Sequence, residues 1–528
     1  MNDNIRIETQ IRSLTTLLDD LRQGNLQVPP FQRDFVWDRD AVKDLFDSIR
    51  NNYPIGSILL WKPKTQQPWK SLRRVGSYEL PKTNEQKTFL LDGYQRLSSL
   101  FGCLTNPFKS GLLKKTEEYN TFFSLYFDLE DETFTYLRSN NSPSSHQVPV
   151  YILMSTSDFR QYSRKYIEPF CDPEKLDTYL DRADMFSRSL VDYKLAVIEI
   201  SGADLSDAVN IFSRVNSKGT DISYDWMVNA LSYNEEFQFA YEIDTIKEKL
   251  LAYNFGSISR NTIFRCYQSA FDDKLYIDQT NIEALATRSD FCSVVKTVSP
   301  CIIKAVEFLY NEMNVIEYKL LPYNIQLVFI MMFFKLLPTP NEKQLNDLKQ
   351  WFWITTYSNY FTIYSLANQR KAFAQFLLYL RGKANEMVYY DDKSIPFKTM
   401  PFPSTIILSG VRSKALILFE LKYCREYTND YLAKTGLFLH KINTQERNMP
   451  ENMIPFCSIK EKESVISNDK LWEMENEKEV VTKYFLPSKS IDVRLFLEKR
   501  KEKLIQAEKG FVEALGIDYT LTTNKEDM

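Results

Sequence analysis

The sequence predicts an α+β protein, in which an N-terminal ParB/sulfiredoxin-like domain precedes a largely α-helical C-terminal half. Up to Ile200, short apolar runs rich in β-forming residues alternate with stretches of helical period. After Asp204 the strand signals fade and long segments of 3.6-residue period dominate. A chain of 528 residues also exceeds the size at which one hydrophobic core keeps growing. We therefore expect three parts: 1–230, 231–440 and 441–528.

Four apolar runs in the first part have the length and composition of strands. They are SILLW (57–61), TFLLDG (88–93), FFSLYFDL (122–129) and KLAVIEI (194–200). Two helical stretches lie among them, IRSLTTLLDDLRQG ending at Gly24 and DAVKDLFDSIRNN opening near Asp38 and Asp40. The segment 138–149 is rich in Ser, Asn and Pro and predicts an exposed loop.

Helical period continues through the second half of the chain. The predicted helices are AVEFLYNEM (305–313), 321–338, LNDLKQWFWITTY (345–357), RKAFAQFLLYLRG (370–382), SKALILFELKYCREY (413–427) and 491–516. The segment 321–338 is the most apolar, but Asn324, Gln326 and Lys335 interrupt it, which favours a buried helix over a membrane span. In the last helix an apolar stripe is expected, with the charged run 498–503 on a solvated face.

Composition excludes several classes of protein. The net charge is −3, so no global field draws the chain to nucleic acid, and contact with DNA requires a local patch. The seven cysteines are scattered singly, which favours a reducing compartment and argues against a zinc ribbon. The first residues lack the apolar core of a signal peptide, so a cytoplasmic location is expected.

The first candidate site segment is VPPFQRDFVW. Prolines 29 and 30 favour an extended approach, and they place the Gln32 amide and the Arg33 guanidinium at the edge of the next element. Such a pair suits a phosphate or nucleotide. The same residues also fit a solvated ion pair between Arg33 and a nearby aspartate, with Trp37 covering the core.

The second segment is FLLDGYQRLSSLF, an apolar strand that runs through Asp92-Gly93 into a helix beginning near Tyr94. A strand, a glycine turn and a helix N-terminus make an anion site, because free backbone N–H groups and the helix dipole favour phosphate. Asp92 can hold a metal ion, while Gln95 and Arg96 can reach phosphates or position a water. An ordinary turn capped by Asp92 is the alternative.

The third segment, FSRVNSKGTDIS, places Arg214 and Asn216 before a Ser-Lys-Gly-Thr turn, although a plain loop explains the same residues.

Together the three segments and YPIGSILLW resemble the N-terminal domain of GmrSD and SspE proteins, which is related to ParB and sulfiredoxin folds. The resemblance spans most of residues 10–230 and rests on four motifs in order.

The resemblance implies a bacterial anti-phage or restriction-type component that binds, and in the family hydrolyses, an NTP with Mg²⁺. The family's DGQQR box corresponds to Asp92, Gly93, Gln95 and Arg96, and its upstream pair to Gln32 and Arg33. Its Arg-x-Asn and Gly-Thr turn fall on Arg214, Asn216, Gly219 and Thr220. In this assignment Asp92 holds Mg²⁺ and the catalytic group comprises Asp92, Gln95 and Arg96. The nucleotide-binding set is Gln32, Arg33, Gly93, Tyr94, Arg214 and Asn216.

The sequence departs from the family at two places, and both concern catalysis rather than nucleotide binding. The first glutamine of the box is Tyr94 here, which puts hydrolysis in doubt while binding survives. Relatives often end in an HNH nuclease, but the chain has only two histidines, His146 and His440, so this module is expected to be degenerate. DNA cleavage would then belong to a partner nuclease or another defence subunit. A non-catalytic scaffold that binds DNA or a partner is the alternative, and a nuclease with carboxylate ligands is a third hypothesis.

Overall fold

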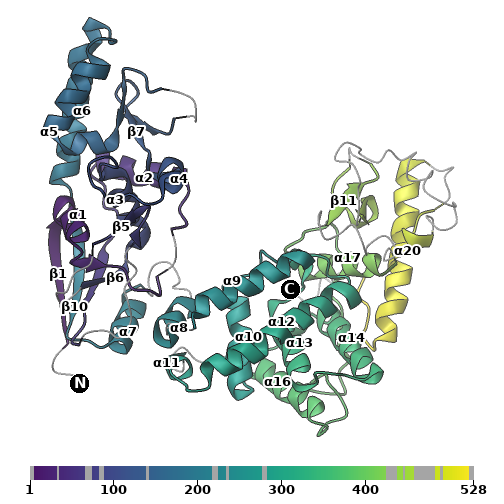
Figure 1. The fold of residues 1–528 in the computed structure, drawn as a ribbon. Helices are drawn as coiled ribbons and strands as arrows, with labels where there is room; N and C mark the ends of the chain where they lie inside the picture. Colours follow the sequence, from purple (N-terminus) through teal and green to yellow (C-terminus); the bar gives the residue numbers. More distant parts are fainter. Residues whose placement is uncertain are drawn as a thin grey trace. The chain divides into compact units, whose positions relative to one another are not determined.

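The computed structural model describes residues 5–32, 35–65, 74–81, 88–137, 142–216, 224–233, 237–275, 282–423, 437–443, 446–456, 482–487 and 492–521. The chain forms two compact units, Met1–Gln238 and Phe239–Met528. Unit 1 contains a mixed sheet covered by helices, and unit 2 is built mainly of helices (Figure 1). The predicted α+β class is therefore confirmed. The predicted boundary at residue 440 stays a prediction.

A five-stranded mixed sheet is the centre of unit 1. Its strands, in spatial order, are β1 (Arg6–Ser13), β10 (Lys194–Ser201), β3 (Ile58–Lys62), β6 (Thr88–Asp92) and β2 (Leu26–Gln27). β10 runs parallel to β3, β2 runs parallel to β6, and the other two pairings are antiparallel. Three of the predicted strands coincide with β3, β6 and β10. The residues Ile11 to Ser13, predicted as helical, belong to β1 instead.

The helices of unit 1 lie around a common apolar core, in which faces of residues 14–23, 39–50, 94–104 and 173–192 are buried. They are α1 (Leu14–Gln23), α2 (Arg39–Arg50), α3 (Tyr94–Leu104), α4 (Thr116–Glu118), α5 (Thr156–Tyr162), α6 (Pro173–Asp192), α7 (Leu205–Asn216) and α8 (Tyr224–Ser232). The predicted caps of the first two helices are confirmed. Gly24 ends α1 with φ 78°, and the Asp38 carboxylate accepts the N–H of Ala41 at the start of α2.

The predicted strand at 122–129 is only partly a strand. Residues Tyr119–Phe123 form a π-helical turn (η1), and β7 covers only Tyr126–Asp128. β7 pairs with β8 (Thr133–Thr135) and β9 (Gln147–Pro149), and a separate hairpin joins β4 (Arg74–Val75) to β5 (Tyr78–Glu79). The end of the expected loop 138–149 is therefore a strand. Phe123 is fully buried against Gly102, so its packing outweighs the β preference of the run.

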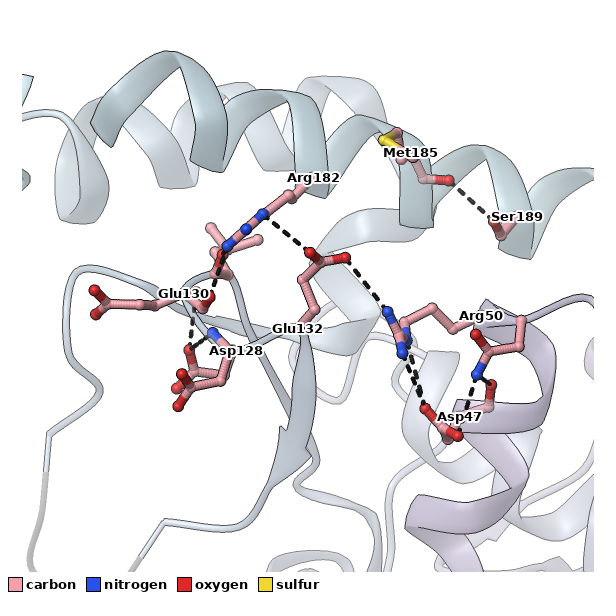
Figure 2. Close-up of polar contacts among 11 residues, drawn as sticks. Asp47, Arg50, Asp128, Glu130, Glu132, Arg182, Met185 and Ser189 are labelled. Carbon is pink, nitrogen blue, oxygen red and sulfur yellow. Dashed lines mark hydrogen bonds and ion pairs between the residues drawn. The ribbon is translucent and has the colours of Figure 1, made fainter. Parts of the chain in front are cut away.

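Helix α6 is attached to the small sheet by ion pairs. Figure 2 shows the Glu132 carboxylate between two guanidiniums, those of Arg50 on α2 and Arg182 on α6. The N–O distances are 3.3 Å and 3.2 Å, and Arg182 also donates to the carbonyl of Leu129 at 2.8 Å. These side chains are 28–40% exposed, so solvent screens their attraction.

The described residues of unit 2 form helices and one hairpin. The elements are α9 (Phe239–Leu250), η4 (Leu251–Tyr253), α10 (Arg260–Asp272), α11 (Ile282–Ala286), α12 (Phe291–Glu312), η6 (Tyr318–Leu320), α13 (Asn324–Leu336), α14 (Glu342–Tyr357), α15 (Tyr360–Ile363), α16 (Leu366–Leu380), α17 (Val411–Tyr423), β11 (Phe438–Lys441), η9 (Pro450–Asn452), β12 (Met453–Phe456) and α20 (Val493–Ala514). The predicted helices of this half are all present. In α13, residues 325–334 are buried, as expected for a core helix. Within the described residues, no helix has both the length and the apolar character needed to cross a bilayer.

The terminal helix buries Phe496, Leu497 and Leu504 of its predicted apolar stripe, but it also buries charged residues. Val493 is 46% exposed, whereas Arg500 and Glu508 are completely buried. Arg500 donates to Glu420 of α17 at 2.7 Å, and Arg412 of α17 pairs with Glu508 through two bonds of 2.7 and 2.6 Å. The expectation that 498–503 forms only a solvated face is therefore wrong at Arg500, because a carboxylate on α17 matches its charge.

Candidate functional site

The DGYQR segment forms the junction between β6 and α3, as predicted. Asp92 is the last residue of β6, and Gly93 is the N-cap of α3 with φ 95°. Gly93 has no side chain that can accept a bond, so the cap residue itself makes no side-chain hydrogen bond to the first turn of α3. The alternative in which Asp92 caps the helix is therefore wrong. The turn places the N-terminus of α3 directly after β6, which is the arrangement that favours an anion.

Gly56 makes room for the Arg96 guanidinium, whereas a side chain at Gly93 would meet Ile58 at 2.4 Å and Arg96 only at ordinary contact distance. Gly56 and Gly93 both have positive φ, of 86° and 95°. A Cβ atom at Gly56 would lie 2.4 Å from Nη1 of Arg96, and one at Gly93 would lie 3.6 Å from Nη2. Arg96 donates from Nη1 to the carbonyl of Ile55 at 2.9 Å and from Nη2 to Asp92 at 2.9 Å. The guanidinium is thus fixed between the loop before β3 and the DGYQR turn.

Asp92 is held on one side and accessible on the other. Its Oδ2 accepts from Arg96, while the side chain remains 35% exposed. The Arg96 side chain is 17% exposed. Such a half-exposed pair orients the carboxylate without withdrawing it from solvent.

Gln32 ties the first motif to the second. Its Nε2 donates to the carbonyls of Leu90 at 2.9 Å and Leu91 at 2.8 Å, the two residues before Asp92. The side chain of Gln95 makes the reciprocal contact, because its Oε1 accepts the backbone N–H of Val36 at 2.9 Å. The segments that flank residues 33 and 34 are therefore both bonded to the DGYQR turn. The structure brings together the two motifs that the sequence places 60 residues apart.

Tyr94 points into the core. It is the first residue of α3, it is 6% exposed, and it belongs to the main apolar cluster of unit 1. Its position in the family box is therefore a packing position in this chain.

Other predicted residues are only partly described. Arg33 lies outside the described residues, as do Gly219 and Thr220. Arg214 and Asn216 lie in the last turn of α7, whose backbone is described and whose side chains there are not. Their binding roles stay predictions. Sequence reasoning missed Ile55 and Gly56, although the glycine in YPIGSILLW was a usable signal for a positive φ.

The two histidines lie in different units. His146 is within 3.5 Å of Asp128 and 3.9 Å of Glu130 in unit 1. His440 is in β11 of unit 2, where it is 3% exposed and burial lowers its pKa. In the part of the chain that the structure describes, no three His, Cys, Asp or Glu side chains group as metal ligands.

These features define an α+β domain with a strand-glycine-helix turn supported by a second, upstream motif. Residues 14–233 match the family described as the N-terminal domain of the GmrSD restriction endonuclease. This part of the chain is therefore a domain of the GmrSD type. The match ends before unit 2 begins, so it says nothing about the helical half.

A relative shares part of its sequence with this chain. An uncharacterized protein of Methanocaldococcus jannaschii is 25% identical over 246 residues. The alignment covers 41% of this chain and 41% of that protein, so the chain spans less than half of its relative's length.

Proposed function

We propose that residues 14–233 bind a nucleoside triphosphate with Mg²⁺ at the DGYQR turn, within a restriction-type defence protein of the cytoplasm. One observation carries this proposal: Gln32 and Gln95 join the two motifs by hydrogen bonds beside the N-terminus of α3. The family to which the domain belongs supports the restriction context. A phosphate group suits the turn, since backbone N–H groups and the helix dipole favour an anion there.

The Asp92 carboxylate fits a magnesium ion. One of its oxygens accepts from Arg96, and the side chain keeps access to solvent. Mg²⁺ in nucleotide sites is commonly held by one or two carboxylates together with waters and substrate phosphates. A full protein cage is therefore not required. The bound ion would neutralise phosphate charge and orient the nucleotide.

Arg96 has a positioning role in this proposal. Its bonds to Ile55 and Asp92 fix the direction of the Asp92 carboxylate. Gln95 has a similar role, because its amide oxygen holds the backbone at Val36. Contact of Arg33 and Arg96 with phosphate, and of Gln95 with an attacking water, remains part of the proposal carried by the motif match.

Binding without hydrolysis is the second candidate function. Tyr94 favours it, because this buried side chain stands where the family has a glutamine. A domain of this kind would report nucleotide occupancy to the helical half or to a partner. We propose in addition that the chain lacks an HNH nuclease. A partner nuclease or another defence subunit would then cut the DNA.

The deciding experiment measures binding of ATP, GTP, CTP and UTP with Mg²⁺ by calorimetry, and then phosphate release from each. Asp92→Asn keeps the size of the side chain and removes its charge. Asp19→Asn is the matched control, because Asp19 is an exposed aspartate on α1 that pairs with Arg22. We expect binding in the wild type and the control, and a loss of about tenfold or more in Asp92→Asn, since Mg²⁺ depends on that carboxylate.

Three outcomes discriminate the candidates. Phosphate release that Asp92→Asn abolishes supports the NTPase. Binding without release supports the sensor. Wild-type binding by the double variant Asp92→Ala, Arg96→Ala removes the site from the DGYQR turn.

A further inference from the structure

Strand β1 leaves one edge of the central sheet of unit 1 open. It lies at the end of the strand order, where β10 pairs with one of its sides and, among the described residues, no strand pairs with the other (Figure 1). Edge strands are usually protected by a short length, a bulge, a proline or charged side chains. β1 has eight residues in continuous register with β10, and it contains no proline. Its charges are of both signs, so they do not exclude a strand that carries the same residues.

The backbone groups that face this open edge can be assigned from one hydrogen bond. Leu14, directly after β1, donates to the carbonyl of Tyr193 at 2.9 Å, in line with the register of β1 and β10. Hydrogen-bonded and non-hydrogen-bonded pairs alternate along an antiparallel ladder, so the even-numbered residues of β1 direct their N–H and C=O groups to β10. The N–H and C=O groups of Ile7, Thr9 and Ile11 consequently point to the open edge.

We propose that β1 pairs antiparallel with β1 of a second copy of this chain, so that two copies form one continuous sheet about a two-fold axis. The axis passes between the two Thr9 residues, and Ile7 of each copy lies opposite Ile11 of the other. These are the residues whose N–H and C=O groups point to the open edge, so each pair can exchange two hydrogen bonds. A two-fold interface of this kind requires a surface that is complementary to itself.

The apolar face of β1 meets this requirement because it is symmetric about Thr9. Ile7 and Ile11 lie on the same face, two residues before and two residues after Thr9, and their exposed fractions are 53% and 75%. In the proposed register each isoleucine lies beside an isoleucine of the second copy, and threonine lies beside threonine. Cross-strand pairs of β-branched side chains and of threonines stabilise antiparallel sheets. The pairing therefore covers both exposed isoleucines.

The charges on the other face are complementary in the same register. Arg12 donates to Glu199 at 2.7 Å and lies 3.7 Å from Asp20, so two carboxylates share one guanidinium and the local charge is negative. Arg6 of the second copy would lie opposite Arg12, where it supplies the missing positive charge. A register shifted by one residue in each copy, with Gln10 on the axis, would instead bring the exposed Glu8 to these carboxylates. Charge therefore favours the register centred on Thr9.

Sedimentation velocity of the full chain over a dilution series measures the dimer. Thr9→Pro removes the N–H that crosses the axis and leaves the bonds to β10 in place, because an edge strand tolerates proline where its nitrogen faces solvent. Thr9→Val is the matched control, since it keeps the N–H and the branched shape. We expect a concentration-dependent dimer in the wild type and the control. Association should be about tenfold or more weaker in Thr9→Pro, because two hydrogen bonds are lost. Circular dichroism checks the fold of each variant.

Arg6→Glu tests the charges without changing the backbone. It brings a further carboxylate to Asp20 and Glu199 of the second copy, so association should weaken by about fivefold or more. The effect should shrink at high salt, because these side chains are partly exposed. Arg6→Lys keeps the charge and should associate as the wild type does.

Thr9→Cys tests the register, because the Cα atoms of a hydrogen-bonded antiparallel pair lie about 5.5 Å apart, within the range of a disulfide. We expect a cross-linked dimer on a non-reducing gel, with the wild type and its seven cysteines as the background. The proposal is overturned if the wild type is a monomer at every concentration, if Thr9→Pro and Thr9→Val associate alike, or if Gln10→Cys cross-links in place of Thr9→Cys. β10 and β3 lie between β1 and β6, so nucleotide binding by these variants tests the DGYQR turn separately.

Discussion

Two arginine–carboxylate pairs in this chain share their chemistry and differ in their surroundings. In unit 1, Arg96 and Asp92 are 17% and 35% exposed, and the carboxylate keeps access to solvent. In unit 2, Arg412 and Glu508 are 6% and 0% exposed, and Tyr357 and Tyr519 also donate to that carboxylate. A carboxylate whose lone pairs are all occupied has no capacity left for a ligand. Burial and partner number, rather than residue type, separate a candidate site from a structural pair.

The pairs of unit 2 are arranged reciprocally. α17 supplies Arg412 and Glu420, and α20 supplies Glu508 and Arg500, so each helix contributes one charge of each sign, eight residues apart. Because arginine precedes glutamate on both helices, the two pairs match only when the helices run antiparallel in one register. A shift by one turn would leave four buried charges without partners, which is very costly.

The largest effect is expected from breaking the buried pair. Arg412→Ala leaves the Glu508 carboxylate buried without its counter-charge, so unit 2 should lose about 3–5 kcal/mol of unfolding free energy. Hydrogen–deuterium exchange of peptides from α17 and α20 measures this loss locally. Arg288→Ala breaks exposed pairs with Asp272 and Asp290 and serves as the control. If the peptides were equally protected from exchange in the two variants, Arg412 would not be the structural residue that its buried pair with Glu508 indicates.

The next effect concerns the space around Arg96. Gly56→Ala combines a positive φ with a Cβ atom 2.4 Å from Nη1, and should cost unit 1 about 1–3 kcal/mol. Gly111→Ala has a similar φ of 66° but meets nothing within 4 Å. Urea unfolding of the two variants isolates the displacement of Arg96. Gly56→Ala should therefore weaken Mg²⁺-dependent nucleotide binding more than Gly111→Ala does. Equal binding by the two variants would contradict the positioning role of Arg96.

A pH effect follows from Glu420. Burial raises its pKa to about 7, and the charge of Arg500 opposes that shift. A carboxyl with a raised pKa gives its full stability below its unfolded value of 4.5 and loses it as the pH rises toward 7. Relative to Glu420→Gln, the wild type should therefore lose up to about 1.4 kcal/mol per pH unit within that window. A constant difference from pH 4.5 to 7 would show that Glu420 is ionised throughout.

The smallest effect is expected at the exposed network of Figure 2. Arg50→Ala removes contacts with Asp47 and Glu132, yet all three side chains are at least 28% exposed. Unit 1 should lose only about 0.2–1 kcal/mol, and the loss should shrink at high salt. Thermal unfolding at two ionic strengths measures it. A loss as large as that of Arg412→Ala would remove the contrast between exposed and buried pairs.

Local patterns in the sequence determined the fold class and the location of the candidate site. Apolar runs marked β3, β6 and β10, and Gly24 and Asp38 marked helix ends, because caps and strand periodicity depend on neighbouring residues. The strand-glycine-helix junction at Asp92 and Gly93 could be predicted for the same reason. The buried helix α13 was readable from its composition, since polar residues within an apolar run exclude a span.

Only the tertiary structure decided which side chains meet. That Gln32 bonds to β6, that Gly56 borders Arg96, and that Arg500 is buried against Glu420 all join residues far apart in the sequence. Such contacts depend on how the elements pack, and no local pattern specifies packing. From sequence alone, a charged residue in a run of alternating charge is predicted to be solvated, unless its partner on another helix is known. The structure also placed Tyr94 in the core, because the direction of a side chain at a helix start depends on what covers that face.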